Sequence, residues 1–323
     1  MNKIALAIHG GAGTILRSQM TPDLEREYRN GLEAGLTAGW SILNSGGSSL
    51  DAVEAAVASL EDFPLFNAGR GAVFTHEGKQ EMDASIMDGS NLKAGAVASV
   101  KNIKNPVKLA RLVMERTEHV LLAGEGANQF AEQIGVETKP DEYFFTEHRW
   151  LQLQGALADG RVYLDHAPSE PGAIATGFSP HSALRIPHSK GTVGAVACDS
   201  HGHLAAATST GGMTNKRFGR VGDTALIGAG TFADDICAVS CTGHGEYFML
   251  GVTAYDVAAR MKYKGLSLED AAQETIDRLT EINGEGGLIA IDTHCNVTMP
   301  LNSEGMYRGF VTSGGELKTD IFQ

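Results

Sequence analysis

Long hydrophobic runs and a basic excess are lacking in this chain of 323 residues, and the first residues do not have the pattern expected of a secretory leader. No apolar stretch approaches the ~20 residues that a membrane-spanning helix needs. Residues 1–8 run directly into glycines, without the length or the small-residue cleavage site of a signal peptide. With 26 basic against 39 acidic residues, the net charge is −13, and no basic cluster is available for phosphate contacts. We therefore expect neither a membrane nor a nucleic-acid partner.

Cysteine is also scarce, and its spacing excludes a zinc or redox motif. The cysteines form no CxxC pair and lie among apolar residues. This pattern predicts buried free thiols in a reducing compartment, the cytoplasm, rather than disulfides or a metal site. The four are Cys198, Cys237, Cys241 and Cys295.

The chain is rich in glycine and has the apolar content of an ordinary globular protein. Hydrophobic residues make up 42% and charged residues 20%, which predicts a globular fold and excludes wholesale disorder. The 40 glycines indicate many tight turns or close backbone approaches. The length is sufficient for one large α+β domain over residues 1–323.

Several helices are predicted by start signals and by apolar periodicity. Thr21 before Pro22 suits an N-cap and a first helical position, and Ser48 opens a second helix after Gly46. Asn105 before Pro106 begins a third. Further helices are expected over 123–134, 246–261 and 267–282. Residues 137–190 lack sustained periodicity, and about 165–191 read as a flexible linker.

Two strands are predicted over 192–198 and 204–210, on either side of Asp199-Ser200-His201-Gly202-His203. A three-residue loop with Gly202 in the left-handed conformation would pair Asp199 with His203. Counting outward from that pair places Thr210 opposite Thr192. Residues 287–297 repeat this layout, so we expect two stacked sheets covered by helices. Turn histidines are usually solvated, and no metal site is expected at His201, His203 or His294.

The bond between Gly191 and Thr192 has a chemical consequence if it is cut. Thr192 would then carry a hydroxyl and a free α-amine, and an α-amine with a pKa of about 7.7–8.0 is a usable base at neutral pH. A threonine inside a chain has no such neighbour. The hypothesis is a precursor that cleaves itself before Thr192.

Three further motifs each allow a structural and a functional interpretation. His9-Gly10-Gly11-Ala12-Gly13 lacks the ending of a phosphate loop, and a tight turn beside an active site is preferred. Arg220 and Asp223 form either a surface ion pair or a clamp for a zwitterion, in which arginine takes a carboxylate and aspartate an ammonium group. Residues 242–246 form either a tight strand-to-helix turn or an oxyanion cradle of glycine amides.

Taken together, these motifs resemble the plant-type asparaginases (isoaspartyl peptidases), a branch of the N-terminal-nucleophile hydrolases. The resemblance covers nearly the whole chain, with its motifs in the family's order. They are HGGAG from His9, PLFNAGRGAVFT over 64–75, MDASIMDG from Met82, GTVGAVA from Gly191, TSTGGMTNKRFGRVGD over 208–223, SCTGHGE from Ser240 and NSEGMYRG from Asn302.

The resemblance implies a four-layer αββα sandwich and self-cleavage into an α subunit, 1–191, and a β subunit, 192–323. Two such pairs would form an (αβ)2 dimer of heterodimers. The implied activity is hydrolysis of β-aspartyl dipeptides and of the side-chain amide of L-asparagine, with no cofactor required for catalysis.

The resemblance also implies roles for individual residues. Thr192 would be the nucleophile, positioned by Thr210 and Thr242, and Asn67 would orient its amine. Thr242 and the Gly243 amide would stabilise the oxyanion. Substrate would be bound by Arg220, Asp223, Thr242, Gly243 and Gly245.

Members of the family hold a structural sodium ion through backbone carbonyls of the loop after the second helix. Arg70 stands where relatives commonly have an aliphatic residue, so its guanidinium would change the electrostatics of that loop. The implied ligands are the carbonyls of Leu60, Glu61, Phe63, Phe66, Ala68 and Arg70.

Two other functions remain open at this stage. A glycosylasparaginase-like amidase would share the fold, but such enzymes are expected with a signal peptide and disulfides. A non-catalytic zwitterion-binding protein would keep the clamp without needing Thr192. Product release from glycosylated asparagine against a β-aspartyl dipeptide separates the first alternative, and ammonia release from asparagine that survives Thr192→Ala would favour the second.

Overall fold

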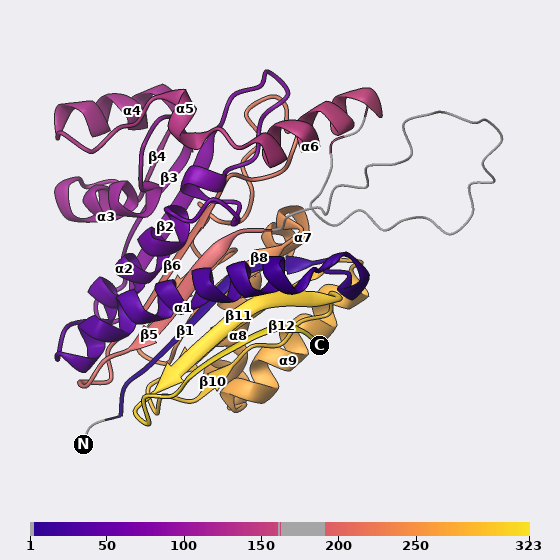
Figure 1. Ribbon diagram of the computed structural model, residues 1–323. Helices are drawn as coiled ribbons and strands as arrows, with labels where there is room; N and C mark the ends of the chain where they lie inside the picture. The colour runs from indigo at the N-terminus through magenta and orange to yellow at the C-terminus, as the bar shows by residue number, and fades with distance from the viewer. Residues whose placement is uncertain (1–2, 161, 163–190) are drawn as a thin grey trace.

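The computed structural model describes residues 3–160, 162 and 191–323. Its strands form an eight-stranded sheet in the order β12-β11-β1-β5-β6-β2-β3-β4 and a four-stranded sheet in the order β10-β9-β8-β7 (Figure 1). The larger sheet comprises β1 (Ala5–Gly13), β2 (Met82–Asp88), β3 (Lys93–Val100), β4 (Leu121–Ala123), β5 (Val193–Cys198), β6 (Leu204–Thr210), β11 (Gly305–Thr312) and β12 (Leu317–Phe322). The smaller comprises β7 (Thr231–Ala233), β8 (Cys237–Gly243), β9 (Gly286–Asp292) and β10 (Val297–Thr298).

The helices accompany these sheets in a mixed α+β fold. They are α1 (Pro22–Asn44), α2 (Ser49–Glu61), α3 (Pro106–Arg116), α4 (Gly124–Gln133), α5 (Asp141–Phe144), α6 (Glu147–Ala158), α7 (Gly245–Gly251), α8 (Thr253–Ala259) and α9 (Leu268–Glu281). Short 3-10 turns lie at Arg17–Gln19 and Gly69–Gly71, and a π-helical turn lies at Arg260–Lys264.

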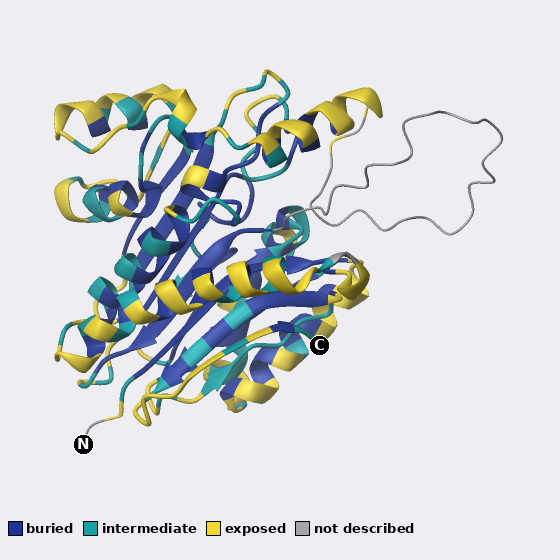
Figure 2. Ribbon diagram, viewed as in Figure 1, coloured by how far each residue is buried: buried dark blue, intermediate teal, exposed yellow. Residues whose placement is uncertain are grey.

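Alternation along the strands decides which way each sheet packs. In β1, Leu6 and Ile8 join the core under α1 and α2, whereas Ala5 and Ala7 face the second sheet. The larger sheet contacts the smaller through β1, β5 and β6 against β8 and β9, and α8 and α9 pack on β8 and β9. The strands in the middle are buried over nearly their whole length, as Figure 2 shows. Because successive side chains of a strand point to opposite faces, the larger sheet contributes to one hydrophobic core on each of its faces.

Two predicted helix starts are confirmed by their caps. The Thr21 hydroxyl accepts a hydrogen bond from the Leu24 N–H at 3.2 Å, and the Ser48 hydroxyl accepts one from the Asp51 N–H at 3.1 Å. Each cap satisfies one of the amides that a helix leaves without a partner at its first turn.

The predicted hairpin register is confirmed. Strands β5 and β6 pair antiparallel with Val193 opposite Ser209, and the Asp199 N–H donates to the His203 carbonyl at 3.0 Å. Gly202 has a φ of +79°, the left-handed conformation that the loop requires. The register leaves Thr192 and Thr210 facing each other at the open end of the hairpin.

Other expectations were wrong in detail. The single helix predicted over 246–261 is broken at Val252, whose φ is +48°, into α7 and α8. The stretch from 137 lacks apolar periodicity, yet α5 and α6 form in it because their few apolar side chains, among them Phe144 and Leu153, are buried locally. The linker predicted over 165–191 lies outside the described residues, except for Gly191.

The cysteines agree with the compositional expectation of free thiols. Among the described residues, all four thiols are free, with Cys198, Cys237 and Cys241 buried and Cys295 partly buried. No helix within 3–160 or 191–323 is both long and apolar enough to cross a membrane.

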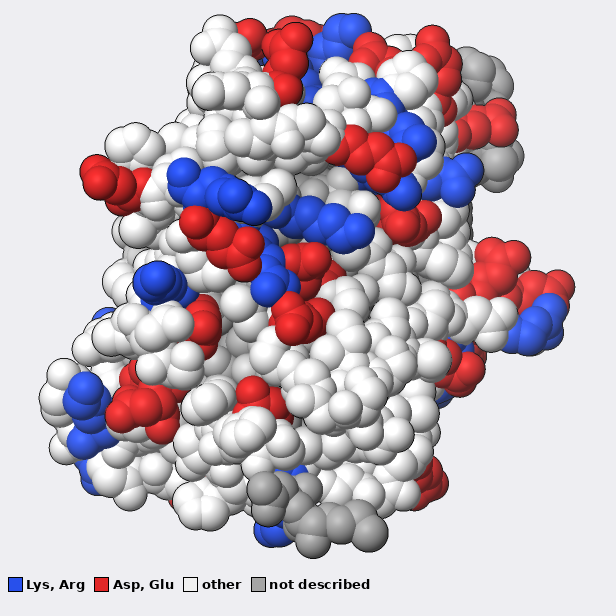
Figure 3. Space-filling model, turned by 90° about the vertical axis from the view of Figure 1, so that its left-hand side faces the viewer, with Lys and Arg blue, Asp and Glu red and all other residues white. Residues whose placement is uncertain are grey.

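Charges of both signs are interspersed on the face shown in Figure 3. The salt bridges explain such mixing: Arg111 on α3, for example, lies within 2.6–3.1 Å of carboxylate oxygens of Asp51, Glu54 and Glu115. Basic side chains of this kind are already paired with acids.

The left-handed Val252 offers a test of backbone strain. Val252→Gly is expected to raise the free energy of unfolding by about 1 kcal/mol, because a β-branched side chain disfavours this conformation and glycine does not. Val120 is similarly exposed, 51% against 47%, and its φ is not positive. Val120→Gly should therefore lower the same quantity, measured by urea unfolding. An equal loss in both variants would refute the account.

Candidate active site

Thr192 lies immediately before β5 and is only 8% exposed. Its hydroxyl donates a hydrogen bond to the Thr210 hydroxyl, with 3.2 Å between the oxygens. The Thr210 oxygen also accepts the Gly212 N–H at 3.0 Å. The hairpin therefore brings two of the predicted residues together, and Thr210 is held in turn by the backbone that follows it.

Gly191 packs against strand β1 in a way that only glycine permits. Its φ is +84°, and a Cβ at this position would lie 2.5 Å from the Gly11 Cα. The HGGAG segment thus forms one wall beside the Gly191–Thr192 bond. The sequence predicted a supporting turn, and the structure makes this segment part of a strand that contacts the bond directly.

His9 fixes the carbonyl of Thr192, a contact that the sequence reasoning missed. Its Nδ1 lies 2.9 Å from the Thr192 carbonyl oxygen, and its Nε2 lies 2.8 Å from Ser240 Oγ. A carbonyl oxygen can only accept, so Nδ1 carries the proton and Nε2 accepts from the serine hydroxyl. Burial lowers the pKa of His9 to about 3, against a smaller opposing effect of the Thr192 hydrogen bond. The ring is therefore neutral and acts as a brace.

Hydroxyl groups continue from His9 between the two sheets. Ser240 Oγ lies 2.7 Å from Thr208 Oγ1, the Thr231 hydroxyl donates to Thr208, and the Ser85 hydroxyl lies 2.7 Å from Thr231 Oγ1. A Cβ on Gly194 would lie 2.0 Å from Ser240 Oγ, so only glycine at this position leaves room for the chain of hydroxyl groups. This buried chain connects the larger sheet to β7 and β8 at the level of Thr192.

Thr242 and Gly243 end strand β8 beside the same wall. The fully buried Thr242 hydroxyl accepts the Ala12 N–H at 3.1 Å. Gly243 has a φ of +155°, and a Cβ there would lie 2.3 Å from the Glu285 carbonyl oxygen. The two residues predicted to form an oxyanion cradle are thus fixed by strand β1 and by the start of β9.

Asn67 supports the turn after Thr210. Its Nδ2 donates to the Gly212 carbonyl at 2.7 Å, its Oδ1 accepts the Val73 N–H at 3.0 Å, and its own carbonyl accepts the Gly211 N–H at 2.9 Å. These bonds tie the loop after α2 to the end of β6. They make Asn67 a brace for Thr210, while its expected role in orienting the nucleophile's amine stays a prediction.

Arg220, Asp223 and Gly245 lie together. A Cβ on Gly245 would lie 2.8 Å from Asp223 Oδ1 and 2.9 Å from Arg220 Nη2, so any other residue would occupy the space between them. Asp223 is 5% exposed, and its Oδ2 has no hydrogen-bond partner among the described residues. Burial raises the pKa of Asp223 to about 7, and Arg220 opposes that rise. An unpartnered buried carboxylate oxygen is a ready acceptor for an ammonium group.

Glu246 holds the arginine of this clamp and was not predicted from the sequence. Arg220 Nε and Nη2 donate to its two carboxylate oxygens at 2.9 and 2.8 Å. The other edge of the guanidinium, Nη1 with Nη2, has no acceptor in the part of the chain that the structure describes. Partial burial opposes ionisation of Glu246, but hydrogen bonds from His244 and Arg220 prevail and lower its pKa. Arg220 is thus oriented along one edge and available along the other.

A buried lysine lies under the clamp. Lys216 is 2% exposed and donates to the Glu81 carbonyl at 2.7 Å. A Cβ on Gly212 would lie 3.1 Å from Lys216 Nζ and 3.6 Å from Arg220 Nη1, so the clamp adjoins the turn that holds Thr210. Burial lowers the pKa of Lys216 and raises that of Asp83, while the attraction between the two charges opposes both shifts.

The loop after α2 packs backbone carbonyls tightly against its glycines, while its predicted role in holding a sodium ion stays a prediction. A Cβ on Gly69 would lie 2.4 Å from the Glu61 carbonyl oxygen, and one on Gly71 would lie 2.0 Å from that of Phe66. The carbonyls of Phe63 and Ala68 each accept one backbone N–H, which leaves a second lone pair on each oxygen, whereas that of Leu60 accepts the N–H groups of both Asp62 and Phe63. The Arg70 guanidinium lies 5.5 Å from the centre of the Tyr143 ring. Uncharged oxygen donors of this kind suit a hard cation.

Comparison with known proteins identifies the family of this chain. The family model described as Asparaginase matches residues 2–321. The chain therefore belongs to the asparaginase family. It is 49% identical over 325 residues to the isoaspartyl peptidase of Salmonella typhimurium, covering 100% of both chains, and 49% identical over 325 residues to that of Escherichia coli, covering 100% of this chain and 97% of the relative. It is 41% identical over 319 residues to the plant-type L-asparaginase of Pyrococcus abyssi, covering 96% and 97%.

The neutral His9 brace can be tested by nuclear magnetic resonance on protein labelled with ¹⁵N-histidine. We expect the His9 ring to stay neutral, with the proton on Nδ1, at every pH from 5 to 8, because protonation begins only near its pKa of about 3. Ser240→Ala removes the donor to Nε2 and should shift the Nε2 resonance while leaving Nδ1 protonated. A proton on Nε2, or a titration above pH 5, would contradict the assignment.

Proposed function

We propose that this protein hydrolyses β-aspartyl dipeptides and the side-chain amide of L-asparagine, with Thr192 as the nucleophile. One observation carries the proposal: a buried threonine hydroxyl is bonded to Thr210, and the turn after Thr210 adjoins a clamp with one available arginine edge and one carboxylate oxygen that has no hydrogen-bond partner among the described residues. Relatives named isoaspartyl peptidase, at 49% identity, support the same reaction.

The nucleophile is released by cleavage of the chain itself. Thr192 Oγ attacks the Gly191 carbonyl carbon, the bond to the Thr192 nitrogen breaks, and that nitrogen takes the hydroxyl proton. Water then hydrolyses the resulting ester, leaving a Gly191 carboxylate and a free Thr192 amine. The products are an α subunit of residues 1–191 and a β subunit of residues 192–323. His9 holds the Thr192 carbonyl throughout, so the new terminus stays in place.

In the mature enzyme the same hydroxyl attacks the side-chain carbonyl of the substrate. The Thr192 α-amine accepts the hydroxyl proton and passes it to the leaving amine, which departs as ammonia or as the shortened peptide. Thr242 and the Gly243 amide stabilise the oxyanion, because donors fixed in a dry site need no reorganisation. Water then hydrolyses the β-aspartyl ester on Thr192. Thr210 and, through the turn, Asn67 hold the nucleophile in position.

The clamp selects an α-amino acid end. The α-carboxylate binds the Nη1–Nη2 edge of Arg220 that Glu246 leaves available, and the α-ammonium binds Asp223 Oδ2. Gly245 leaves room for both. Two charges of opposite sign at fixed separation distinguish this end of the substrate from a plain amide.

Four broader features belong to the same proposal. The packing of helices on two contacting sheets supports the αββα sandwich of N-terminal-nucleophile hydrolases. A sodium ion in the loop after α2 would be coordinated by its backbone carbonyl oxygens and would fix the loop that carries Asn67. Assembly as an (αβ)2 dimer remains a prediction. So does the cytoplasmic location, with which four free thiols agree.

Intact-mass measurement of purified protein tests the cleavage. We expect two fragments with a boundary before Thr192, and an uncut chain in Thr192→Ala. Gly191→Ala should slow cleavage at least about tenfold, because its Cβ would collide with the Gly11 Cα. Gly160→Ala is the matched control: its φ is +65°, and no atom of the described residues lies within 4 Å of a Cβ placed there, so it should be cut normally. An active enzyme that remains a single chain would refute the proposal.

The raised pKa of Asp223 predicts how ligand affinity depends on pH. An ammonium group binds the ionised carboxylate, and with a pKa of about 7 the ionised fraction rises about tenfold from pH 6 to pH 8. The Kd of the mature enzyme for L-aspartate should therefore fall about tenfold over this range, measured by calorimetry. Asp223→Asn should bind weakly at both pH values. A flat profile in the unmodified enzyme would exclude this role.

A further inference from the structure

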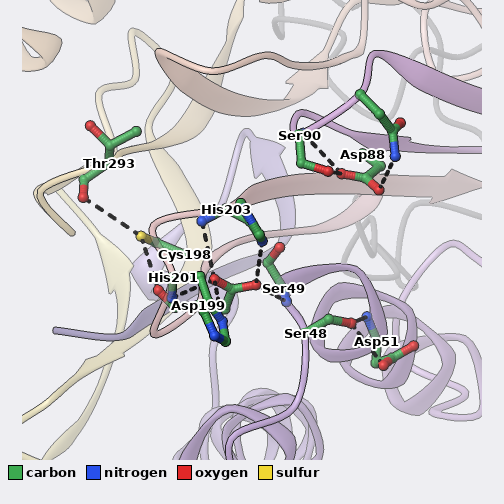
Figure 4. Close-up of polar contacts among 11 residues, drawn as sticks. Ser48, Ser49, Asp51, Asp88, Ser90, Cys198, Asp199, His201, His203 and Thr293 are labelled. Atoms are coloured by element: carbon green, nitrogen blue, oxygen red, sulfur yellow. Dashed lines mark hydrogen bonds and ion pairs between the residues drawn. The ribbon is translucent and has the colours of Figure 1, made fainter. Parts of the chain in front are cut away.

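The turn between β5 and β6 places two imidazoles beside one buried carboxylate (Figure 4). The Asp199 side chain is 2% exposed. His201 Nδ1 lies 3.9 Å from Asp199 Oδ1, and His203 Nδ1 lies 3.7 Å from Oδ2. One ligand atom from each residue can be chosen so that all three lie within 4.8 Å of one another. The two rings are nearly parallel, with centroids 5.7 Å apart.

The backbone fixes the Asp199 carboxylate in this position. Its Oδ1 accepts the N–H groups of His201 and His203 at 2.9 and 3.1 Å. Its Oδ2 accepts the N–H of Ser49, at the first turn of α2, at 3.2 Å. The carboxylate therefore connects the hairpin to α2. Its distance to each histidine ring exceeds that of a hydrogen bond.

A second turn, between β9 and β10, has the same backbone design but does not place two histidine side chains beside its aspartate. Asp292 Oδ1 accepts the N–H groups of His294 and Asn296, both at 2.9 Å, as Asp199 does in the first turn. Cys295 takes the left-handed conformation there, with a φ of +62°, where Gly202 does so in the first turn. The difference is at the last position, where Asn296 Nδ2 donates to Asp292 Oδ2 at 2.8 Å. Asn296 closes the second turn directly, whereas His203 does not close the first.

The spacing in the first turn suits a metal ion. Bonds of about 2.0–2.2 Å from zinc to nitrogen and oxygen put tetrahedral ligands about 3.4 Å apart, close to the 3.7 and 3.9 Å seen. Imidazole nitrogen with carboxylate oxygen favours a borderline transition metal over magnesium or calcium. Both rings are largely exposed, so small rotations suffice to converge on one ion.

We propose that Asp199, His201 and His203 form a site for a divalent transition-metal ion such as Zn²⁺, with water completing the coordination. The sequence-based expectation of merely solvated histidines took no account of the buried carboxylate between them. The site lies at the closed end of the hairpin, roughly 20 Å along β5 from Thr192 at about 3.3 Å per residue. The ion therefore stabilises the hairpin and its junction with α2 and takes no part in the hydrolysis.

The test uses tag-free, chelator-treated full-length protein and Zn²⁺ alone. We expect one equivalent to bind by calorimetry and to raise the Tm, and Co²⁺ to give the visible bands of a tetrahedral site. His203→Asn rebuilds the first turn as the second and should weaken Zn²⁺ binding at least about tenfold, remove the rise in Tm and leave asparagine hydrolysis unchanged. His294→Asn is the matched control in the second turn and should bind as the original protein does.

Three results would overturn the site. They are no binding of Zn²⁺ to the original protein, equal binding to His203→Asn, or binding that is lost instead in Cys295→Ser. Cys295 is included because its thiol hydrogen-bonds to that of Cys198, and Cys198 adjoins Asp199. This pair of thiols could bind zinc in place of the histidines. The unchanged hydrolysis by His203→Asn distinguishes loss of the metal site from loss of the fold.

Discussion

The antiparallel pairing of β5 with both β6 and β1 is the constraint on which the rest of the site depends. On one side, the register with β6 sets Thr192 against Thr210. On the other, β5 pairs with β1 from Cys198 opposite Ala5 to Gly194 opposite His9. His9 thereby reaches the Thr192 carbonyl, and Ala12 further along β1 reaches Thr242. A shift of one residue in either pairing would turn these side chains to the opposite face and separate all of them.

Small residues make this convergence compatible with close packing. The face of the larger sheet that meets the smaller one is lined by Ala5, Ala7 and Ala206, so the sheets approach closely enough for a hydroxyl chain to run between them. The absence of a side chain at Gly194 leaves room for the Ser240 hydroxyl, and its absence at Gly245 leaves room for the clamp. A larger side chain at these glycines would meet a polar group with no room to move, so steric and chemical requirements coincide there.

Sequence patterns predict the local features of this structure, such as turns and helix caps, but not the contacts between residues far apart in the chain. The hairpin register and the caps at Thr21 and Ser48 follow from turn and capping chemistry, which acts over a few residues. His9 could be placed near the site by its glycines, but its contact with Thr192 spans 183 residues and depends on strand order. Val252 breaks a helix that periodicity favours, because packing against β7 and β8 overrides propensity. Glu246 was assigned to a turn, and only the fold reveals Arg220 beside it.

Electrostatic interactions explain why the clamp of Arg220 and Asp223 is surrounded by other charged residues. Burial alone would leave Asp223 mostly protonated at neutral pH, and the charge of Arg220 opposes that effect. Glu246 takes one edge of the guanidinium and so holds it away from full pairing with Asp223, while its negative charge helps keep the pKa of Asp223 near 7. Lys216 and Asp83 lie beneath and offset each other's charge. The result is an aspartate poised between its two forms. In the proposed mode of binding, the ammonium group of the substrate would convert it to the carboxylate. Part of the binding free energy would then drive a deprotonation that only a cationic ligand favours, and this would favour zwitterions over neutral amides.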